Sequence, residues 1–306
     1  MPALSQTRAY IALLLVTVLW GTFPSTAKLA LDSLPPVFLT AVRGALASAF
    51  LVTLLLRSGA DATRELTADT VRTFLVLGVA GLVVSMQVSY LGIYFTTAAN
   101  AAILQAAAPI MVALGARVYL GERLRREQRL GVGVSALGVL LVVTDGRLAG
   151  LRAAELRAGD FLTLAALVGW SAYTVYGKRV LRAHSPAVAT AGAYVCGTLV
   201  LAALAGLTAP LFPAPVLASP VAWAVVLYHA IFGAVAHLWW YRAVERVGAS
   251  RAAVFMNVTP VVGVALAWAL LGERIGPWQA LGAACVLAGV ALTTRPRPSV
   301  RPRAAG

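Results

Sequence analysis

Long apolar segments recur along the whole chain and are separated by short polar stretches. Each is about 20 residues long, the length at which a helix rising 1.5 Å per residue crosses about 30 Å of hydrocarbon. The segments do not alternate between apolar and polar positions as the strands of a membrane β-barrel do. We therefore predict an all-α, polytopic membrane protein with ten transmembrane helices, near residues 9–29, 36–56, 73–95, 98–119, 129–145, 159–177, 187–207, 222–241, 252–271 and 277–293.

The second half of the chain repeats the pattern of the first. Pro109 precedes Gly121-Glu122 by twelve residues, and Pro260 precedes Gly272-Glu273 by the same distance. Trp20 and Tyr90 of the first half correspond to Trp170 and Tyr241 of the second. A duplication of this extent indicates two structural repeats. We place them at 8–145 and 159–293, joined by a loop at 146–158 and followed by a basic tail at 294–306.

An odd number of spans in each repeat has a geometric consequence. With five helices per repeat, the second repeat enters the membrane from the opposite side, so the two repeats are inverted. Inverted repeats can exchange conformations, which is the physical basis of alternating access in secondary transporters. The pattern therefore favours a transporter, with a facilitating channel as the alternative.

The charges give the expected orientation. The chain is 60% hydrophobic and only 12% charged, against roughly 25% charged residues in soluble domains, yet its net charge is +14. When the loops are assigned alternately to the two membrane faces, 19 of the 25 basic residues lie on one of them. By the positive-inside rule this face is cytoplasmic, which places both termini inside the cell and the protein in the inner (plasma) membrane. The lipid bilayer is thus the partner of the positive charge, and no nucleic acid is needed to explain it.

Motifs for chemistry are absent from the sequence. It has no Walker-type lysine loop, no His-Glu-x-x-His and no Gly-x-Ser-x-Gly, and it contains only three histidines. An intramembrane enzyme would also have no need of inverted repeats. We therefore expect no catalytic residue, no cofactor and no metal, and a small molecule as the substrate.

The Trp20-Gly21 pair and the doubled Pro…Gly-Glu-Arg signature resemble the drug/metabolite transporter superfamily. More narrowly, residues 8–293 resemble an EamA-type exporter with two EamA repeats. This resemblance implies a secondary carrier that exports amino acids, related metabolites or toxic organic compounds. One departure is that Ser171 follows Trp170 where Gly21 follows Trp20, so the two repeats have unequal roles.

Arg43 is the basic residue expected inside a helix. An ionisable group at membrane depth usually faces a cavity or a partner helix. A guanidinium can hold a carboxylate with two hydrogen bonds, which makes Arg43 a candidate anchor for an anionic or zwitterionic substrate. The alternatives are contact with lipid headgroups and pairing with backbone carbonyls.

Helix 222–241 carries two histidines. His229 and Trp240 are eleven positions apart and therefore lie on nearly one helical face. His229 is a candidate site for substrate or protons, and a neutral hydrogen-bonding role is its alternative. His237 is a weaker candidate for the same role.

The other candidates for the substrate site are polar and aromatic residues within predicted helices. Some of them have a structural alternative, because a proline inside a helix leaves a carbonyl free one turn earlier. Gln105 and Asn257 lie near Pro109 and Pro260 and fit such a supporting role. The complete set is Trp20, Arg43, Gln87, Tyr90, Tyr94, Gln105, Trp170, Tyr173, His229, Trp240 and Asn257.

Other residues are interpreted structurally. Glu122 and Glu273 are expected to cap the helices that follow them, and Lys28 and Lys178 to reach toward the headgroups rather than to gate. The pairs Gly131/Gly138 and Gly282/Gly289 favour close helix contacts, within the chain or in a homodimer. Cys196 and Cys285 are expected to be free thiols.

Overall fold

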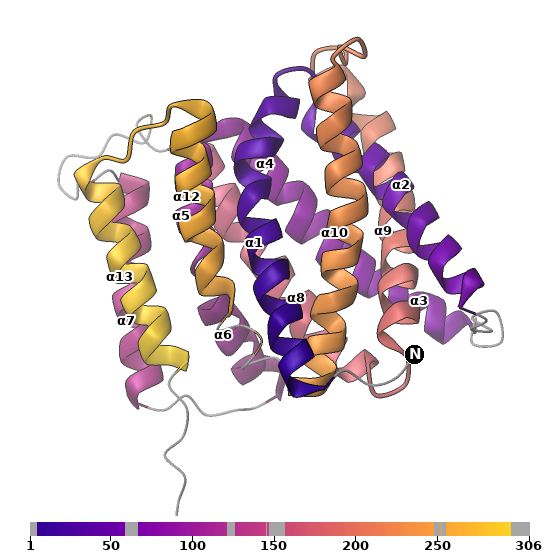
Figure 1. Cartoon of the computed structure of the whole chain (residues 1–306), viewed down its shortest axis with the longest axis horizontal. Helices are drawn as coiled ribbons and strands as arrows, with labels where there is room; N and C mark the ends of the chain where they lie inside the picture. The colour runs from indigo at the N-terminus through magenta and orange to yellow at the C-terminus, as the bar shows by residue number, and fades with distance from the viewer. Residues whose placement is uncertain are drawn as a thin grey trace, which may run out of the picture.

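The architecture comes from a computed structural model that describes residues 5–58, 67–120, 126–144, 146, 157–247, 252 and 255–294. Within these ranges every regular element is a helix (Figure 1). Gly121 and Glu122 of the first signature lie outside the described residues, as do residues 147–156 of the connecting loop 146–158 and residues 295–306 of the tail 294–306.

The first half contains the following helices. Residues 68–95 form one long helical segment whose middle part has π-helical geometry, and residues 98–120 form a helix interrupted near its centre. The elements are α1 (Gln6–Leu31), α2 (Pro36–Arg57), α3 (Ala68–Gly78), the π-helical η2 (Val79–Gln87), α4 (Val88–Phe95), α5 (Ala98–Gln105), α6 (Ala108–Leu120) and α7 (Arg126–Thr144).

The second half follows a similar order. Two short 3-10 turns accompany its helices. The elements are α8 (Ala158–Val180), α9 (Pro186–Thr208), η4 (Ala209–Leu211), α10 (Pro220–Val247), η5 (Phe255–Asn257), α12 (Val258–Leu271) and α13 (Pro277–Thr294).

Helix length and composition make this a multi-pass membrane protein. In the described part of the chain, six helical segments are long and apolar enough to cross a bilayer: Gln6–Leu31, Pro36–Arg57, Ala68–Phe95, Ala98–Tyr119, Pro186–Leu211 and Pro220–Val247. Large apolar side chains such as Leu199 and Leu207 are exposed on their surfaces. Hydrocarbon rather than water is the medium that suits such a surface.

Helices of one half pack against helices of the other. α1 lies against α10, and α4 lies against α8, its counterpart pair under the duplication; α2 packs on α9 and α5 on α12. α7 and α13 stand side by side at one end of the molecule (Figure 1). α1 begins and α13 ends at the lower edge of the same view.

Glycines bring α7 and α13 into backbone contact. A Cβ atom on Gly138 would lie 2.6 Å from the carbonyl oxygen of Gly282, and one on Gly282 would lie 2.7 Å from the carbonyl oxygen of Gly138. Neither separation is possible for a real side chain, so only glycine permits this approach. The glycine faces predicted from the sequence are therefore used within the chain.

The helices around the two prolines differ from simple continuous spans. The helix expected over 98–119 is divided, because α5 ends at Gln105 and α6 begins at Ala108, just before Pro109. Beyond Pro260, α12 ends at Leu271, and Gly272 adopts a positive φ of 64° while its N–H bonds to the carbonyl of Trp268, 3.2 Å away. This left-handed position favours glycine, which explains its place in the signature.

Glu273 does not cap the helix that follows it. Its two carboxylate oxygens accept hydrogen bonds from the backbone N–H groups of Ala98 and Ala99, at 2.9 and 2.8 Å. These are free amides at the start of α5, where the helix dipole also favours a negative charge. The capping chemistry was predicted correctly, but the helix was wrong, because the packing of α12 on α5 brings a nearer N-terminus to the carboxylate.

Lys28 corrects a second expectation. Its ammonium does not reach for headgroups but donates to the carbonyls of Ile93 and Thr96, at 2.9 and 2.8 Å, with a longer contact to Tyr94 at 3.4 Å. Those carbonyls lie at the end of α4, where helical partners run out and a cation is favourable. Lys178, its counterpart, is exposed, so the two repeats differ here.

A third polar contact binds the turn between α4 and α5, which Glu273 and Lys28 also contact. Asp160, in the first turn of α8 and only 1% exposed, accepts a hydrogen bond from the Thr96 hydroxyl at 2.5 Å. The amide of Asn100 lies 3.5 Å from both carboxylate oxygens. We name residues 93–100 the α4–α5 turn; α1, α8 and the segment after α12 all bind it.

Candidate transport cavity

A cavity of about 120 Å³ lies between helices of both halves. Helices α1, α2, α4, α5, α6, α8, α10 and α12, together with η2 and η5, contribute to its wall. The lining residues are Trp20, Phe23, Pro24, Arg43, Gly81, Ser85, Met86, Ser89, Tyr90, Ile93, Gln105, Ala108, Thr163, Ala166, Leu167, Trp170, His237, Met256 and Thr259.

The π-helical stretch η2 forms one wall. Because a π-helix turns more slowly than an α-helix, it changes which side chains face inward, and such stretches are frequent at functional sites. Gly81 packs on Tyr173 so closely that an added Cβ would lie 2.5 Å from the ring. The stretch thereby presents Ser85 and Met86 to the cavity.

Two tryptophans at equivalent positions of the repeats meet at the cavity. The ring centroids of Trp20 and Trp170 are 5.0 Å apart and the rings are nearly perpendicular, at 84°. This edge-to-face geometry is favourable for aromatic pairs. His237 lies against the same pair, with its ring centroid 5.3 Å from that of Trp20. Equivalent residues of the two repeats therefore contact each other at this cavity.

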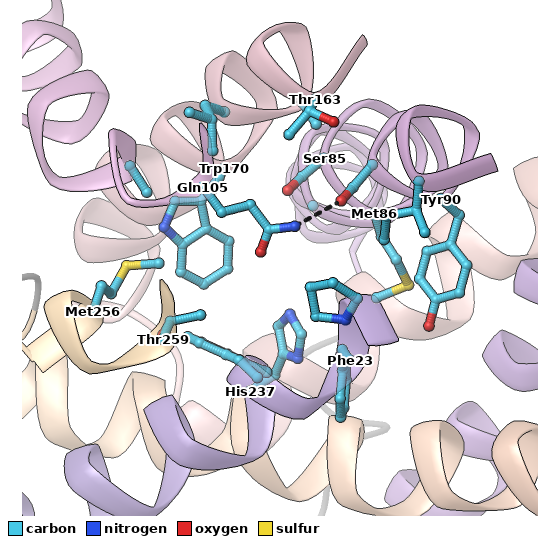
Figure 2. A pocket seen from close by; sticks show the side chains of 18 of the residues that line it. Phe23, Ser85, Met86, Tyr90, Gln105, Thr163, Trp170, His237, Met256 and Thr259 are labelled. Carbon is cyan, nitrogen blue, oxygen red and sulfur yellow. Dashed lines mark hydrogen bonds between the residues drawn. The ribbon is translucent and has the colours of Figure 1, made fainter. Parts of the chain in front are cut away.

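Gln105 supplies a polar group near the middle of the cavity. Figure 2 shows its amide extended into the space between Trp170 on one side and Met86 and Tyr90 on the other. Its nitrogen lies 3.5 Å from the hydroxyl of Ser89, a weak contact that leaves the amide open to another partner. Thr163 and Thr259 add hydroxyl groups to the wall.

Arg43 places a buried positive charge at the wall. Its side chain is 1% exposed, which is incompatible with an interaction with lipid headgroups. It donates to the Tyr90 hydroxyl at 3.2 Å and to the His229 carbonyl at 3.0 Å, while its Nε has no hydrogen-bond partner in the described structure. No carboxylate lines the cavity within the described residues. The rings of Phe23 and Tyr90 offer only cation–π contacts, at 5.8 and 5.6 Å.

His229 supports Arg43 from behind the wall. It is fully buried and does not line the cavity. Both ring nitrogens have hydroxyl partners: Nε2 lies 2.8 Å from the Thr26 oxygen, and Nδ1 is hydrogen-bonded to Tyr90. The ring thus fixes the Tyr90 hydroxyl that receives the Arg43 bond. His237, considered the weaker candidate, is the histidine that reaches the cavity.

Several other sequence candidates lie outside the cavity lining. Gln87 is buried and hydrogen-bonds Thr40, while Tyr94 contacts Phe212, with a ring separation of 6.3 Å. Tyr173 and Trp240 are fully buried and do not line the cavity. Tyr173 stacks on Tyr241 at 4.8 Å, and Trp240 lies 5.3 Å from Trp20. The side chain of Asn257 is outside the described part of the structure.

The structure thus joins Trp20, Arg43, Tyr90, Gln105 and Trp170 in one cavity and leaves the other described candidates behind its walls. It also adds lining residues that the sequence analysis missed. Ser85 and Ser89 are four residues apart, a spacing that could have indicated a shared helical face. No feature of the sequence indicated that Thr163, Met86 and Met256 line a cavity.

Both thiols are free and half-buried, as expected for residues without a disulfide role. In the described residues no group of His, Cys, Asp and Glu side chains is arranged to hold a metal ion.

Known transporters match this chain over nearly its whole length. The EamA-like transporter family matches residues 7–144 and again 157–295. A probable amino-acid metabolite efflux pump of Salmonella typhimurium is 30% identical over 90% of this chain and 91% of its own. An uncharacterised transporter of Bacillus subtilis is 28% identical, with 92% of both chains covered. A probable terminal-alkyne amino-acid exporter of Streptantibioticus cattleyicolor is 27% identical, with 94% of both chains covered.

A solved crystal structure shares the fold. It superposes with a TM-score of 0.68 and 21% sequence identity, covering 94% of this chain and 96% of the other. The doubled match, the membrane-spanning helices and these relatives identify a transporter rather than an enzyme. The chain belongs to the EamA-like transporter family.

Proposed function

We propose that this protein is a secondary transporter that exports amino acids, related small metabolites or toxic organic compounds by alternating access. The moving parts are two inverted five-helix repeats, and the substrate site is the cavity between them. The meeting of Trp20 and Trp170 at this cavity carries the proposal. Two residues at equivalent repeat positions contact there, as expected if the binding site lies on a pseudo-two-fold axis.

The charge of the cavity indicates which substrate group it binds. Arg43 is buried without a carboxylate partner in the described residues, and an uncompensated charge in such a place is costly. A substrate carboxylate would accept hydrogen bonds from the unused donors of the guanidinium and neutralise it. The aromatic rings around it suit an apolar substrate body.

The size of the cavity favours a carrier over an open channel. Its volume is about 120 Å³, whereas binding sites for organic ligands commonly span about 300–1,000 Å³. A cavity of this size fits a mechanism in which the repeats move apart to admit cargo, as alternating access requires.

The orientation completes the proposal. The basic loops lie in the cytoplasm, both termini are inside, and the protein resides in the inner membrane. Cysteine-accessibility labelling of tags at the two ends tests this arrangement, and termini on opposite faces would overturn it together with the inverted repeats.

Counterflow in proteoliposomes tests the transport mechanism. The vesicles are loaded with amino acids or analogues from a panel, and the uptake of labelled substrate added outside is measured. A carrier gives saturable uptake that is accelerated by substrate on the trans side. Flux that does not saturate and shows no trans-stimulation would support the channel alternative.

The role of Arg43 is tested in the same vesicles. Arg43→Gln should weaken transport of carboxylate-bearing substrates by at least about tenfold, because hydrogen bonds to charged groups contribute about 1.5–3 kcal/mol. Arg43→Lys keeps the charge but not the planar fork and should give an intermediate effect. Arg72→Gln, at an exposed arginine of α3, is the control. Equal transport by all variants, at equal protein levels, would remove Arg43 from the site.

A further inference from the structure

A second pocket, separate from the cavity, lies between α6 and α8. It has a volume of about 350 Å³ and is lined by Tyr119, Val175, Lys178, Arg179 and Arg182. None of these residues lines the central cavity. Its size falls within the range of about 300–1,000 Å³ that is typical of ligand sites.

The pocket is strongly positive. Three of its five lining residues are cations, and no carboxylate lines it within the described residues. The Arg179 guanidinium donates to the Tyr119 hydroxyl at 3.2 Å, and the Tyr119 ring packs edge-on against Tyr176 at 6.3 Å. Arg179 is therefore held by a neutral partner, and no carboxylate among the described residues of this pocket compensates its charge. Such a pre-organised guanidinium suits a phosphate group.

The first repeat has no such basic cluster at the equivalent positions. At the equivalent positions of the first repeat, Lys28 corresponds to Lys178, Leu29 to Arg179 and Asp32 to Arg182. Lys28 caps the end of α4, and Leu29 and Asp32 form no positive cluster. The basic triad is thus an addition to one membrane face only.

The surroundings select a lipid rather than a soluble ligand. α6 ends at the lower edge of Figure 1, where α1 also begins. Beside the pocket on α6, Val118 is 86% exposed and Tyr119 is 46% exposed, so apolar surface adjoins the cations. An anionic headgroup with its acyl chains satisfies both features, because basic pockets between transmembrane helices bind such headgroups.

We propose that this pocket binds the phosphodiester headgroup of an anionic phospholipid. The headgroup contacts Lys178, Arg179 and Arg182, while an acyl chain lies along Val118. Since α6 belongs to the first repeat and α8 to the second, a bound lipid bridges the two repeats and stabilises the conformation in which they meet here. That the lipid comes from the cytoplasmic leaflet rests on the orientation in the proposed function; the binding itself does not.

Native mass spectrometry of the full-length protein in detergent tests the proposal. The protein is titrated with phosphatidylglycerol, phosphatidylcholine or inorganic phosphate, and the bound fraction is measured. Phosphatidylglycerol should bind more tightly than the other two. In the double variant Arg179→Gln/Arg182→Gln its affinity should fall by about tenfold or more, since each basic residue near the membrane surface contributes measurably to anionic-lipid binding.

Two variants separate a specific pocket from general surface charge. Arg57→Gln/Arg72→Gln removes two exposed arginines outside the pocket and should leave the affinity unchanged. Tyr119→Phe keeps every charge but removes the hydroxyl that holds Arg179, and should weaken binding by a few-fold.

Three results would overturn the proposal. Equal loss of affinity in both arginine double variants would show that net charge, not this pocket, attracts the lipid. Equal binding of phosphatidylcholine and phosphatidylglycerol would remove the role of the anionic headgroup. Inorganic phosphate binding as tightly as phosphatidylglycerol would identify a soluble anion as the ligand. Because no transport is measured, a failure here leaves the proposed export function standing.

Discussion

Removing the carboxylate of Glu273 should loosen the start of α5. Glu273→Ala deprives the N–H groups of Ala98 and Ala99 of their acceptors, which lie 2.9 and 2.8 Å away. A hydrogen bond to a charged group contributes about 1.5–3 kcal/mol, so the two together stabilise this contact by about 3–6 kcal/mol. Glu273→Gln keeps one carbonyl acceptor and loses the interaction of a full negative charge with the helix dipole. Its cost should be roughly half that of the alanine variant.

Amide hydrogen exchange measures this effect where it occurs. In Glu273→Ala, the peptide covering the α4–α5 turn should exchange at least about a hundredfold faster, because each 1.4 kcal/mol of lost protection corresponds to a factor of ten and about 3 kcal/mol or more is lost. Glu245→Gln, at an exposed glutamate of α10, is the control and should leave exchange unchanged. Unaltered exchange at the α4–α5 turn in Glu273→Ala would show that the carboxylate does not cap α5. Faster exchange everywhere would instead indicate global destabilisation.

Two further predictions concern one contact within the first half and one contact between the halves. Lys28→Met should lower the free energy of unfolding in zwitterionic detergent by about 1.5–3 kcal/mol, because carbonyls at the end of α4 lose a charged donor. Lys178→Met, at the exposed counterpart of Lys28, should change this free energy by less than about 0.5 kcal/mol. Gly138→Ala should cost about 1–3 kcal/mol by forcing α7 from α13, whereas Gly133→Ala on the same helix meets no atom within 4 Å and should stabilise by about 0.5–1 kcal/mol. Equal effects within either pair would refute the contact on which it rests.

The sequence by itself determined the class of protein and its division into two repeats. Apolar length decides whether a segment suits a membrane, and this is a local property that needs no tertiary information. The duplicated signature likewise marked Pro109 and Gly272 as equivalent positions of the two repeats; the structure added the break before Pro109 and the positive φ at Gly272. Trp20 and Trp170 could be chosen for the same reason, as equivalent positions of two repeats.

The partners of each polar group were decided only by the tertiary structure. Helical periodicity ranks His229 and His237 by depth and face, but the packing of α10 on α1 and α2 puts only His237 at the cavity and places His229 behind Arg43. Glu273 binds the start of α5 and Lys28 binds the end of α4, both far from them in sequence. The unpaired amides and carbonyls of a helix end bind whichever charged group the fold brings closest. Periodicity along one helix contains no information about the neighbouring helix, and for that reason the lining of the cavity had to come from the packing of many helices at once.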